Sequence, residues 1–236
     1  MKVLEFNTNN GIYSFELGNF NTEFHAHPAY EIVIATDGNF SVLTSNSENI
    51  NLSFAVIEAN VRHKVLAYNC RLELLMIEHN NLWIKTILAK HNIDTESGIY
   101  VESTIQKRSA LFHYLQQNFC PDERRNYDDR IHKCLEFFES ENVEYSLMVK
   151  ELQNKVHLSE SRLSHLFKDE IGVSLKKYLV WSRLKKTINS VLENQENLFS
   201  ASMRCGFYDQ AHFSKTFKET LGISPSEVYN SRTLQD

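Results

Sequence analysis

One pattern occurs twice in this chain: residues 163–174 read LSHLFKDEIGVS, and residues 213–224 read FSKTFKETLGIS. In both copies, apolar residues recur three and four positions apart, which is the spacing of one face of an α-helix. A glycine and then a serine follow, and these residue types commonly end one helix and begin the next. The sequence therefore predicts two copies of one small helical unit. Two copies suit a protein that contacts successive major grooves of DNA.

Each repeated helix follows a shorter segment with helical periodicity, at residues 147–154 and 198–204. We expect Ser159 to cap the first repeated helix and Ser174 to cap a long helix that runs to about Leu192. The sequence Ser-Pro-Ser-Glu at residues 224–227 predicts a capping box at the start of a last short helix. The predicted arrangement is two helix-turn-helix units joined by a long helix.

The two repeated helices each have a polar face opposite the apolar one. Leu163, Leu166 and Phe167 share one face of the first helix, as Phe213 and Phe217 do in the second. Polar side chains on the other face can meet base edges or phosphates. The candidate DNA-binding residues are Ser161, Ser164, His165, Lys168, Gln210, Ala211, His212, Ser214, Lys215 and Lys218.

Residues 205–225, which read CGFYDQAHFSKTFKETLGISP, resemble the signature of the AraC/XylS family of bacterial transcription regulators. The resemblance covers about residues 128–236 and implies two helix-turn-helix units whose second helices enter successive major grooves. It also implies double-stranded DNA and RNA polymerase as partners, a small-molecule effector, a homodimer, and activation of a nearby operon. Three positions depart from the family: Gln153 and Ser202 replace a small alanine, and His157 replaces a turn glycine. We therefore expect looser packing in the first unit.

The N-terminal part has a different pattern. Short runs rich in β-forming residues alternate with Asn, Gly and Ser clusters over residues 1–80, which predicts a mainly-β sandwich or small barrel. The expected strands are 12–17, 31–35, 40–44, 55–58, 64–67 and 72–78.

Helical periodicity begins at Leu82, and a charged segment at residues 120–126 is the expected domain boundary. Leu111, Phe112, Leu115 and Phe119 form an apolar stripe that fits either a pairing surface or packing on the chain's own barrel. The predicted organisation is a sensor domain at 1–80, a helical linker or dimerisation region at 81–127, and a DNA-binding domain at 128–236.

A histidine motif lies in the N-terminal part. The spacing G-x6-HxH-x3-E-x6-G is formed by Gly18, His25, His27, Glu31 and Gly38. It resembles the first motif of the cupin family with one extra residue after the glycine, whereas the second motif is matched only by His63. The resemblance implies a cupin-like barrel. Alternation along a strand puts His25 and His27 on one side. If Glu31 and His63 converge there, the set would suit iron, manganese, nickel or zinc.

Several interpretations of these histidines remain open. They can form an effector pocket, with Phe24, Tyr30 and Glu31 at its mouth or wall, or be satisfied by hydrogen bonds without a metal. The barrel can also serve assembly alone. A further alternative is a metal-dependent cupin oxygenase or isomerase with an attached helical domain. We expect a regulator and not an enzyme, because the enzyme alternative depends only on His25, His27, Glu31 and His63.

Bulk properties agree with a cytoplasmic protein. The 236 residues are 42% hydrophobic and contain no apolar run near the roughly 18 residues of a membrane span. The N-terminus lacks the pattern of a signal peptide. Four cysteines show neither zinc-finger nor disulfide spacing. The net charge is -5, so DNA contacts must come from local clusters of Lys and Arg in the C-terminal part.

Overall fold

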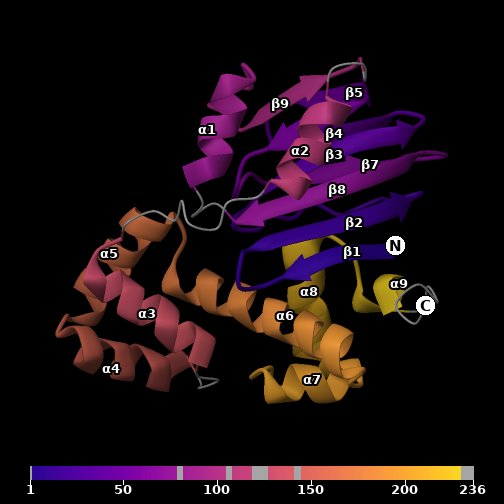
Figure 1. Cartoon of the computed structure of the whole chain (residues 1–236). Coiled ribbons are helices and arrows are strands. Elements are labelled where there is room, and N and C mark those ends of the chain that lie inside the picture. The colour runs from indigo at the N-terminus through magenta and orange to yellow at the C-terminus, as the bar shows by residue number, and fades with distance from the viewer. Residues whose placement is uncertain (1, 79–81, 105–107, 119–126, 141–144, 230–236) are drawn as a thin grey trace. The chain divides into compact units, whose positions relative to one another are not determined.

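The structure, a computed structural model, describes residues 2–78, 82–104, 108–118, 127–140 and 145–229. The chain forms two compact units: Met1–Arg124 together with Phe217–Asp236, and Arg125–Thr216. A β-rich part comes first and helices follow (Figure 1). This order confirms the predicted fold class. The expected boundary at residues 120–126 lies outside the described residues.

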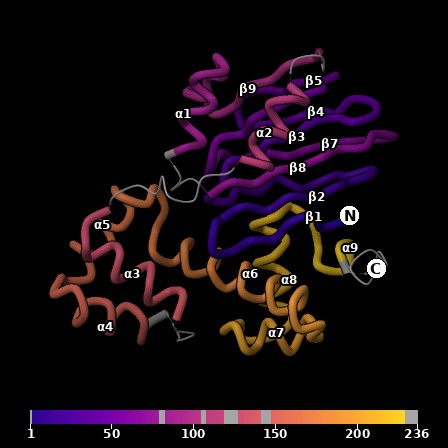
Figure 2. Tube along the Cα trace, in the orientation of Figure 1, coloured from indigo at the N-terminus to yellow at the C-terminus, as the bar shows by residue number. Residues whose placement is uncertain are grey.

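The β-rich part contains two antiparallel sheets. One has six strands in the order β1-β2-β8-β3-β6-β9, and the other has three in the order β5-β4-β7; Figure 2 shows the path of the chain through them. The strands are β1 (Lys2–Asn7), β2 (Ile12–Gly18), β3 (Ala29–Asp37), β4 (Phe40–Thr44), β5 (Glu48–Leu52), β6 (Phe54–Ile57), β7 (His63–Leu66), β8 (Arg71–Glu78) and β9 (Ile99–Glu102). All six expected strands are present, whereas β1, β5 and β9 were not expected.

Two helices, α1 (Leu82–Lys90) and α2 (Ser109–Gln117), cover one face of the six-stranded sheet (Figure 1). Leu111, Phe112 and Leu115 of α2 are buried there in one apolar cluster with Ile32 and Ile34 of β3. The stripe therefore packs on the chain's own sheet. Phe119, its fourth predicted member, lies outside the described residues.

The compact unit Arg125–Thr216 begins with three helices, α3 (Asp129–Ser140), α4 (Tyr145–Val156) and α5 (Glu160–Ile171). They share one apolar core with the first part of α6 (Leu175–Asn194). Phe138, Phe167 and Tyr178 meet in its centre, with ring centroids 5.1 to 5.7 Å apart. Burial of such large rings dominates the energetics of a small core. This core fixes α5 against α4 and α6.

The remaining helices are α7 (Leu198–Arg204), α8 (Gln210–Leu221) and α9 (Pro225–Tyr229). The long helix α6 extends from the α3–α5 group to α7 (Figure 1). Two helix-turn-helix units joined by a long helix were predicted, and the structure confirms both the pairs and the joining helix. Among the described residues, none of the helices has the length and apolar character needed to cross a membrane.

The predicted caps and helix-ending glycines are present. Ser159 caps α5 and Ser174 caps α6, each accepting a backbone N–H of the first turn. Glycine ends both repeated helices in the left-handed conformation, with φ 79° at Gly172 and 74° at Gly222. Ser224 donates its backbone N–H to the Glu227 carboxylate, as in a capping box. The described cysteines, Cys70, Cys134 and Cys205, are free and buried; Cys120 lies outside the described residues.

Candidate nucleic-acid interface and buried histidine cluster

The polar face of α5 is open to solvent. Leu163 and Phe167 are fully buried, while Ser161, His165 and Lys168 are exposed and Ser164 is half-buried. The core described above accounts for this division, since it takes up the apolar face of the helix. All four candidate residues of the first helix-turn-helix unit are therefore on the accessible side of α5.

The second repeated helix, α8, has the same division. Phe213 is buried against Phe207, with ring centroids 5.1 Å apart. The exposed candidates of α8 are Gln210, Ala211, His212, Lys215 and Lys218, and Ser214 is half-buried. Asp209 accepts the His212 backbone N–H at 2.7 Å and so caps the first turn. Both repeated helices thus present polar side chains of the kind that contacts DNA.

His212 has a defined orientation. Its Nδ1 lies 3.3 Å from the Tyr208 backbone nitrogen, which can only donate. In the neutral ring the proton is then on Nε2, so the outer nitrogen is a hydrogen-bond donor. Tyr208 itself is 83% exposed. The sequence offered no periodicity signal for Tyr208, because it lies in the turn before α8.

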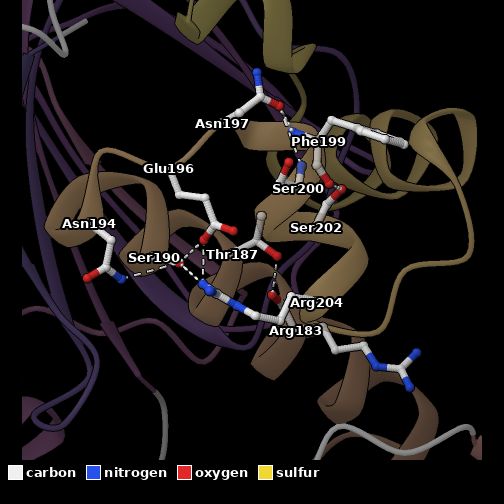
Figure 3. Close-up of polar contacts among 10 residues, drawn as sticks. All are labelled: Arg183, Thr187, Ser190, Asn194, Glu196, Asn197, Phe199, Ser200, Ser202 and Arg204. Atoms are coloured by element: carbon white, nitrogen blue, oxygen red, sulfur yellow. Dashed lines mark hydrogen bonds and ion pairs between the residues drawn. The ribbon is translucent and has the colours of Figure 1, made fainter.

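A polar network joins α6 to α7 (Figure 3). Ser190 of α6 donates to Glu196 at 2.7 Å, and Arg204 of α7 contacts both of these side chains. Asn197 caps α7 by accepting the Phe199 backbone N–H at 2.9 Å. These contacts fix the short connection between the long helix and the second helix-turn-helix unit.

Two of the departures from the family pattern have structural consequences. Ser202 is fully buried, and its hydroxyl donates to the Phe199 carbonyl at 2.8 Å. His157 adopts φ 53° in the turn between α4 and α5. A residue with a Cβ is strained in this left-handed region. The strain follows directly from having histidine where the family has glycine.

Four ionisable side chains meet inside the β-rich part. Glu31 comes from β3 in the larger sheet, and His63 begins β7 in the smaller one. His25 lies opposite His63 in an isolated antiparallel bridge, and His27 follows two residues later. One potential ligand atom from each of the four lies within 4.8 Å of the others. The four are 1 to 4% exposed, so the expected convergence of these residues is present.

All three imidazoles are held in the same way. Nδ1 of His25 contacts the Glu23 carbonyl at 2.9 Å, that of His27 the Ala29 carbonyl at 3.1 Å, and that of His63 the Val61 carbonyl at 2.9 Å. A carbonyl can only accept, so each Nδ1 carries a proton. In a neutral ring, Nε2 then carries a lone pair and no proton. Metal-binding histidines are commonly oriented by such a contact.

Glu31 is the electrostatic centre of the cluster. Its Oε2 lies 2.9 Å from His27 Nε2 and 3.3 Å from His63 Nε2. Burial alone would raise the pKa of Glu31, but the charge of His63 and the hydrogen bonds from His27 and His63 hold it well below its ordinary value. The second oxygen, Oε1, is buried without a hydrogen-bond partner among the described residues. Such an atom is costly to bury.

The two other histidine shifts have opposite signs. Burial, aided by the nearby His63 and His27, lowers the pKa of His25 to about 3. Burial also acts to lower the pKa of His63, but the adjacent Glu31 carboxylate outweighs it and raises that pKa. The cluster therefore combines a carboxylate with a neutral imidazole at His25. Three imidazoles and a carboxylate are ligands that first-row transition metals accept, so the cluster could hold such an ion.

Two of the expected pocket residues lie outside this cluster. Tyr30 belongs to the apolar cluster under α1 and α2, and its hydroxyl donates to Glu58 at 3.2 Å. Because neighbouring residues of a strand point to opposite faces, Tyr30 faces away from Glu31. Phe24 is 36% exposed, with the Arg62 guanidinium 5.0 Å from its ring. The structure thus brings together the four ionisable candidates only.

Residues 152–231 match the protein-family model described as a helix-turn-helix domain. The Arabinose operon regulatory protein of Escherichia coli (strain K12) is 28% identical over 100 residues, which cover 42% of this chain and 34% of that protein. The Msm operon regulatory protein of Streptococcus mutans is 36% identical over 83 residues, which cover 35% of this chain and 30% of that protein. These matches assign a helix-turn-helix domain to residues 152–231, and over that region the chain is similar to the two regulators.

The matched segments span about a third of the length of these two relatives. Both relatives are regulators, which agrees with the expectation that this chain is not an enzyme. A solved structure covers more of the chain: fatty-acid-bound ToxT from Vibrio cholerae matches 92% of this chain and 93% of its own, with a TM-score of 0.56 at 12% identity. This likeness shows the fold alone, a β-rich part followed by helix-turn-helix units.

Proposed function

We propose that this protein is a one-component transcription regulator that binds double-stranded DNA through α5 and α8. The observation that carries the proposal is the doubled unit itself: two capped helices, each with its apolar face buried and its polar face exposed. Each polar face fits a major groove, where side chains read base edges. We also propose a cytoplasmic location, because the proposed partner is DNA.

The exposed residues divide into two chemical groups. Gln210 and His212 can donate hydrogen bonds at the N-terminal end of α8, where recognition helices contact base edges. The Nε2–H of His212 suits the acceptor atoms of guanine. Lys168 and Lys218 lie in the last turns of their helices and suit phosphates, which lysine binds as a point charge. We assign Ser161, Ser164, His165, Ala211, Ser214 and Lys215 to the same DNA-facing surface.

The experiment that tests DNA binding uses the full chain. Genomic fragments that the protein enriches are sequenced, and the most enriched fragment is footprinted. We expect two protected stretches about one helical turn apart on one face of the duplex. Protection of a single half-site, or binding without sequence preference, would contradict the proposal. The genes beside the enriched fragment would also show whether the protein acts as an activator with RNA polymerase.

For the N-terminal part we propose a sensor whose ligand is a divalent first-row transition metal. His25, His27, Glu31 and His63 would hold it. The support is the common orientation of the three imidazoles and the buried Oε1 of Glu31, which has no hydrogen-bond partner in the part of the chain that the structure describes. Because Nδ1 of His27 and of His63 already donates a hydrogen bond, an unprotonated Nε2 would face the negative Oε2 of Glu31. This approach is favourable only if Nε2 carries a second proton or if a cation lies between the groups. A metal ion satisfies all four groups at once.

The alternative ligand class comes from ToxT, whose structure contains an unsaturated fatty acid. A fatty acid needs an apolar channel for its chain, whereas this cluster consists of ionisable groups. Metal analysis of the purified full chain distinguishes the two: we expect close to one ion per chain. Metal-free protein that is stabilised by oleate and not by Zn²⁺ would contradict the metal proposal. A homodimer is inferred from the family, with a pairing surface other than the α2 stripe.

A further inference from the structure

The turn that ends α8 lies against the segment that carries the first histidine of the cluster. Both belong to the compact unit that combines Met1–Arg124 with Phe217–Asp236. The Glu23 backbone N–H donates to the Gly222 carbonyl at 2.6 Å. Gly222 is also buried. The C-terminal end of a proposed DNA-reading helix is therefore part of the surroundings of the cluster.

The approach leaves no room for a side chain on the glycine. A Cβ at Gly222 would lie 2.5 Å from His25 Nδ1, 2.6 Å from Thr22 Cβ and 2.8 Å from the Glu23 carbonyl oxygen. Distances under about 3 Å require the neighbours to move, and two of these neighbours, the imidazole and the backbone carbonyl, are fixed by hydrogen bonds. Gly222 is thus required by this contact as well as by its positive φ.

One peptide segment connects the glycine to the histidine. Glu23 uses its N–H for the Gly222 carbonyl and its own carbonyl for Nδ1 of His25. The segment is held to β7 on both sides: Thr22 donates its N–H to the Val65 carbonyl, and His25 and His63 exchange two backbone hydrogen bonds of 2.9 Å. A change in the position or bonding of the His25 ring must therefore act on Glu23, because the surrounding backbone is fixed.

We propose that a metal ion in the cluster regulates the second helix-turn-helix unit through Glu23 and Gly222. The inference rests on the proposed metal site. Coordination through Nε2 fixes the His25 ring and strengthens its Nδ1–H as a donor to the Glu23 carbonyl. This holds the Glu23 N–H in place for Gly222. Metal binding then favours the docked turn, because a ligand shifts a conformational equilibrium by its differential affinity for the two states.

The first helix-turn-helix unit provides a matched control. Gly172 ends α5 with φ 79°, and its N–H donates to the Lys168 carbonyl at 2.8 Å; Gly222 has φ 74° and donates to the Lys218 carbonyl at the same distance. Gly172 lies in the other compact unit, Arg125–Thr216. Alanine at either position has the same backbone strain, but only at position 222 does it disturb the contact with His25.

The test is hydrogen–deuterium exchange of the full chain, stripped with EDTA and then measured with and without Zn²⁺. In the wild type and in Gly172→Ala, we expect Zn²⁺ to slow exchange in residues 217–225 by about 5-fold or more, the lower end of common coupling factors. The segment 167–175 of the wild type should not respond. In Gly222→Ala, Zn²⁺ should still bind, but it should change the exchange rate of residues 217–225 by less than twofold.

If Gly222→Ala does not fold, Glu23→Pro removes the donating N–H and Glu23→Ala retains it, so only the proline variant should lose the response. Zn²⁺ binding without any change in residues 217–225 would overturn the inference and leave the metal site standing. Loss of the response in Gly172→Ala as well would also overturn it, since strain would then be the cause. Wild-type protein that binds no Zn²⁺ would overturn both proposals.

Discussion

His25 and His63 face each other across two backbone hydrogen bonds of 2.9 Å, with their ring centroids 4.2 Å apart. This bridge joins the HxH segment to β7 and brings both side chains into the cluster with Glu31 of β3. The cluster is thus built from three separate pieces of chain, the HxH segment, β3 and β7.

The first prediction concerns metal content. His27→Ala and His63→Ala should each reduce the bound metal from about one ion per chain to near zero, because each removes an imidazole that would bind the ion directly. Elemental analysis of the purified variants is the measurement. His91→Ala is the control, since His91 is exposed on α1's C-terminal side. Metal retained in the His27 and His63 variants would show that the ion binds elsewhere.

The second prediction concerns stability. A ligand that binds only the folded state stabilises it by about 2.7 kcal/mol at a hundredfold excess over its dissociation constant. Adding Zn²⁺ to stripped wild-type protein should therefore raise its melting temperature by several degrees, and the rise should be absent in His63→Ala. The same shift in both proteins would indicate metal binding outside the cluster.

Much of this architecture follows from local sequence. The helix ends could be predicted because Ser159, Ser174, Gly172 and Gly222 act through their own side chain or backbone conformation. The strands β1, β5 and β9 could not, and each lies at the edge of its sheet. Edge strands have one unpaired side and many polar residues, so their pairing depends on neighbours distant in sequence. The sequence ENINL of β5 has no strand signal of its own.

The candidate site, too, could be predicted only where local sequence determines it. The HxH spacing places two histidines on one side, and alternation along β3 already separates Tyr30 from Glu31. The distance between Glu31 and His63 depends on how two sheets meet, which no local pattern encodes. The contact of Glu23 with Gly222 is also tertiary. The only sequence signal of this contact was Gly222, and the sequence pattern around it already has a local explanation as a helix end.

The third prediction separates base readout from phosphate contact. Gln210→Ala should weaken binding to the preferred site by about 1 to 3 kcal/mol and relax preference at one or two positions. Lys218→Ala should weaken all sequences alike and lower the salt slope by about 1. Binding is measured against a panel of single-base variants at several salt concentrations, with the exposed Lys133→Ala of α3 as the charge control. Identical profiles for the Gln210 and Lys218 variants would contradict the assignment.

The fourth prediction concerns the strained turn at His157 in the first helix-turn-helix unit. His157→Gly should raise the free energy of unfolding by about 0.5 to 1 kcal/mol. Relief of the left-handed strain gains about 1 to 2 kcal/mol, and the greater freedom of glycine in the unfolded chain offsets part of it. His157→Ala retains the Cβ and serves as the control, with no gain expected. Urea denaturation measures both, and equal stability of the two variants would mean that the imidazole and not the backbone matters.

The proposed mode of binding is that α5 and α8 read two major grooves on one face of the duplex. It is tested most directly by inserting about 5 base pairs, half a helical turn, between the two footprinted half-sites. An insertion of about 10 base pairs is the control, because it also lengthens the spacing but returns the two half-sites to the same face of the duplex. We predict that the half-turn insertion abolishes specific binding by the full chain and that a full-turn insertion is less damaging. Unchanged affinity after the half-turn insertion would contradict the two-groove account.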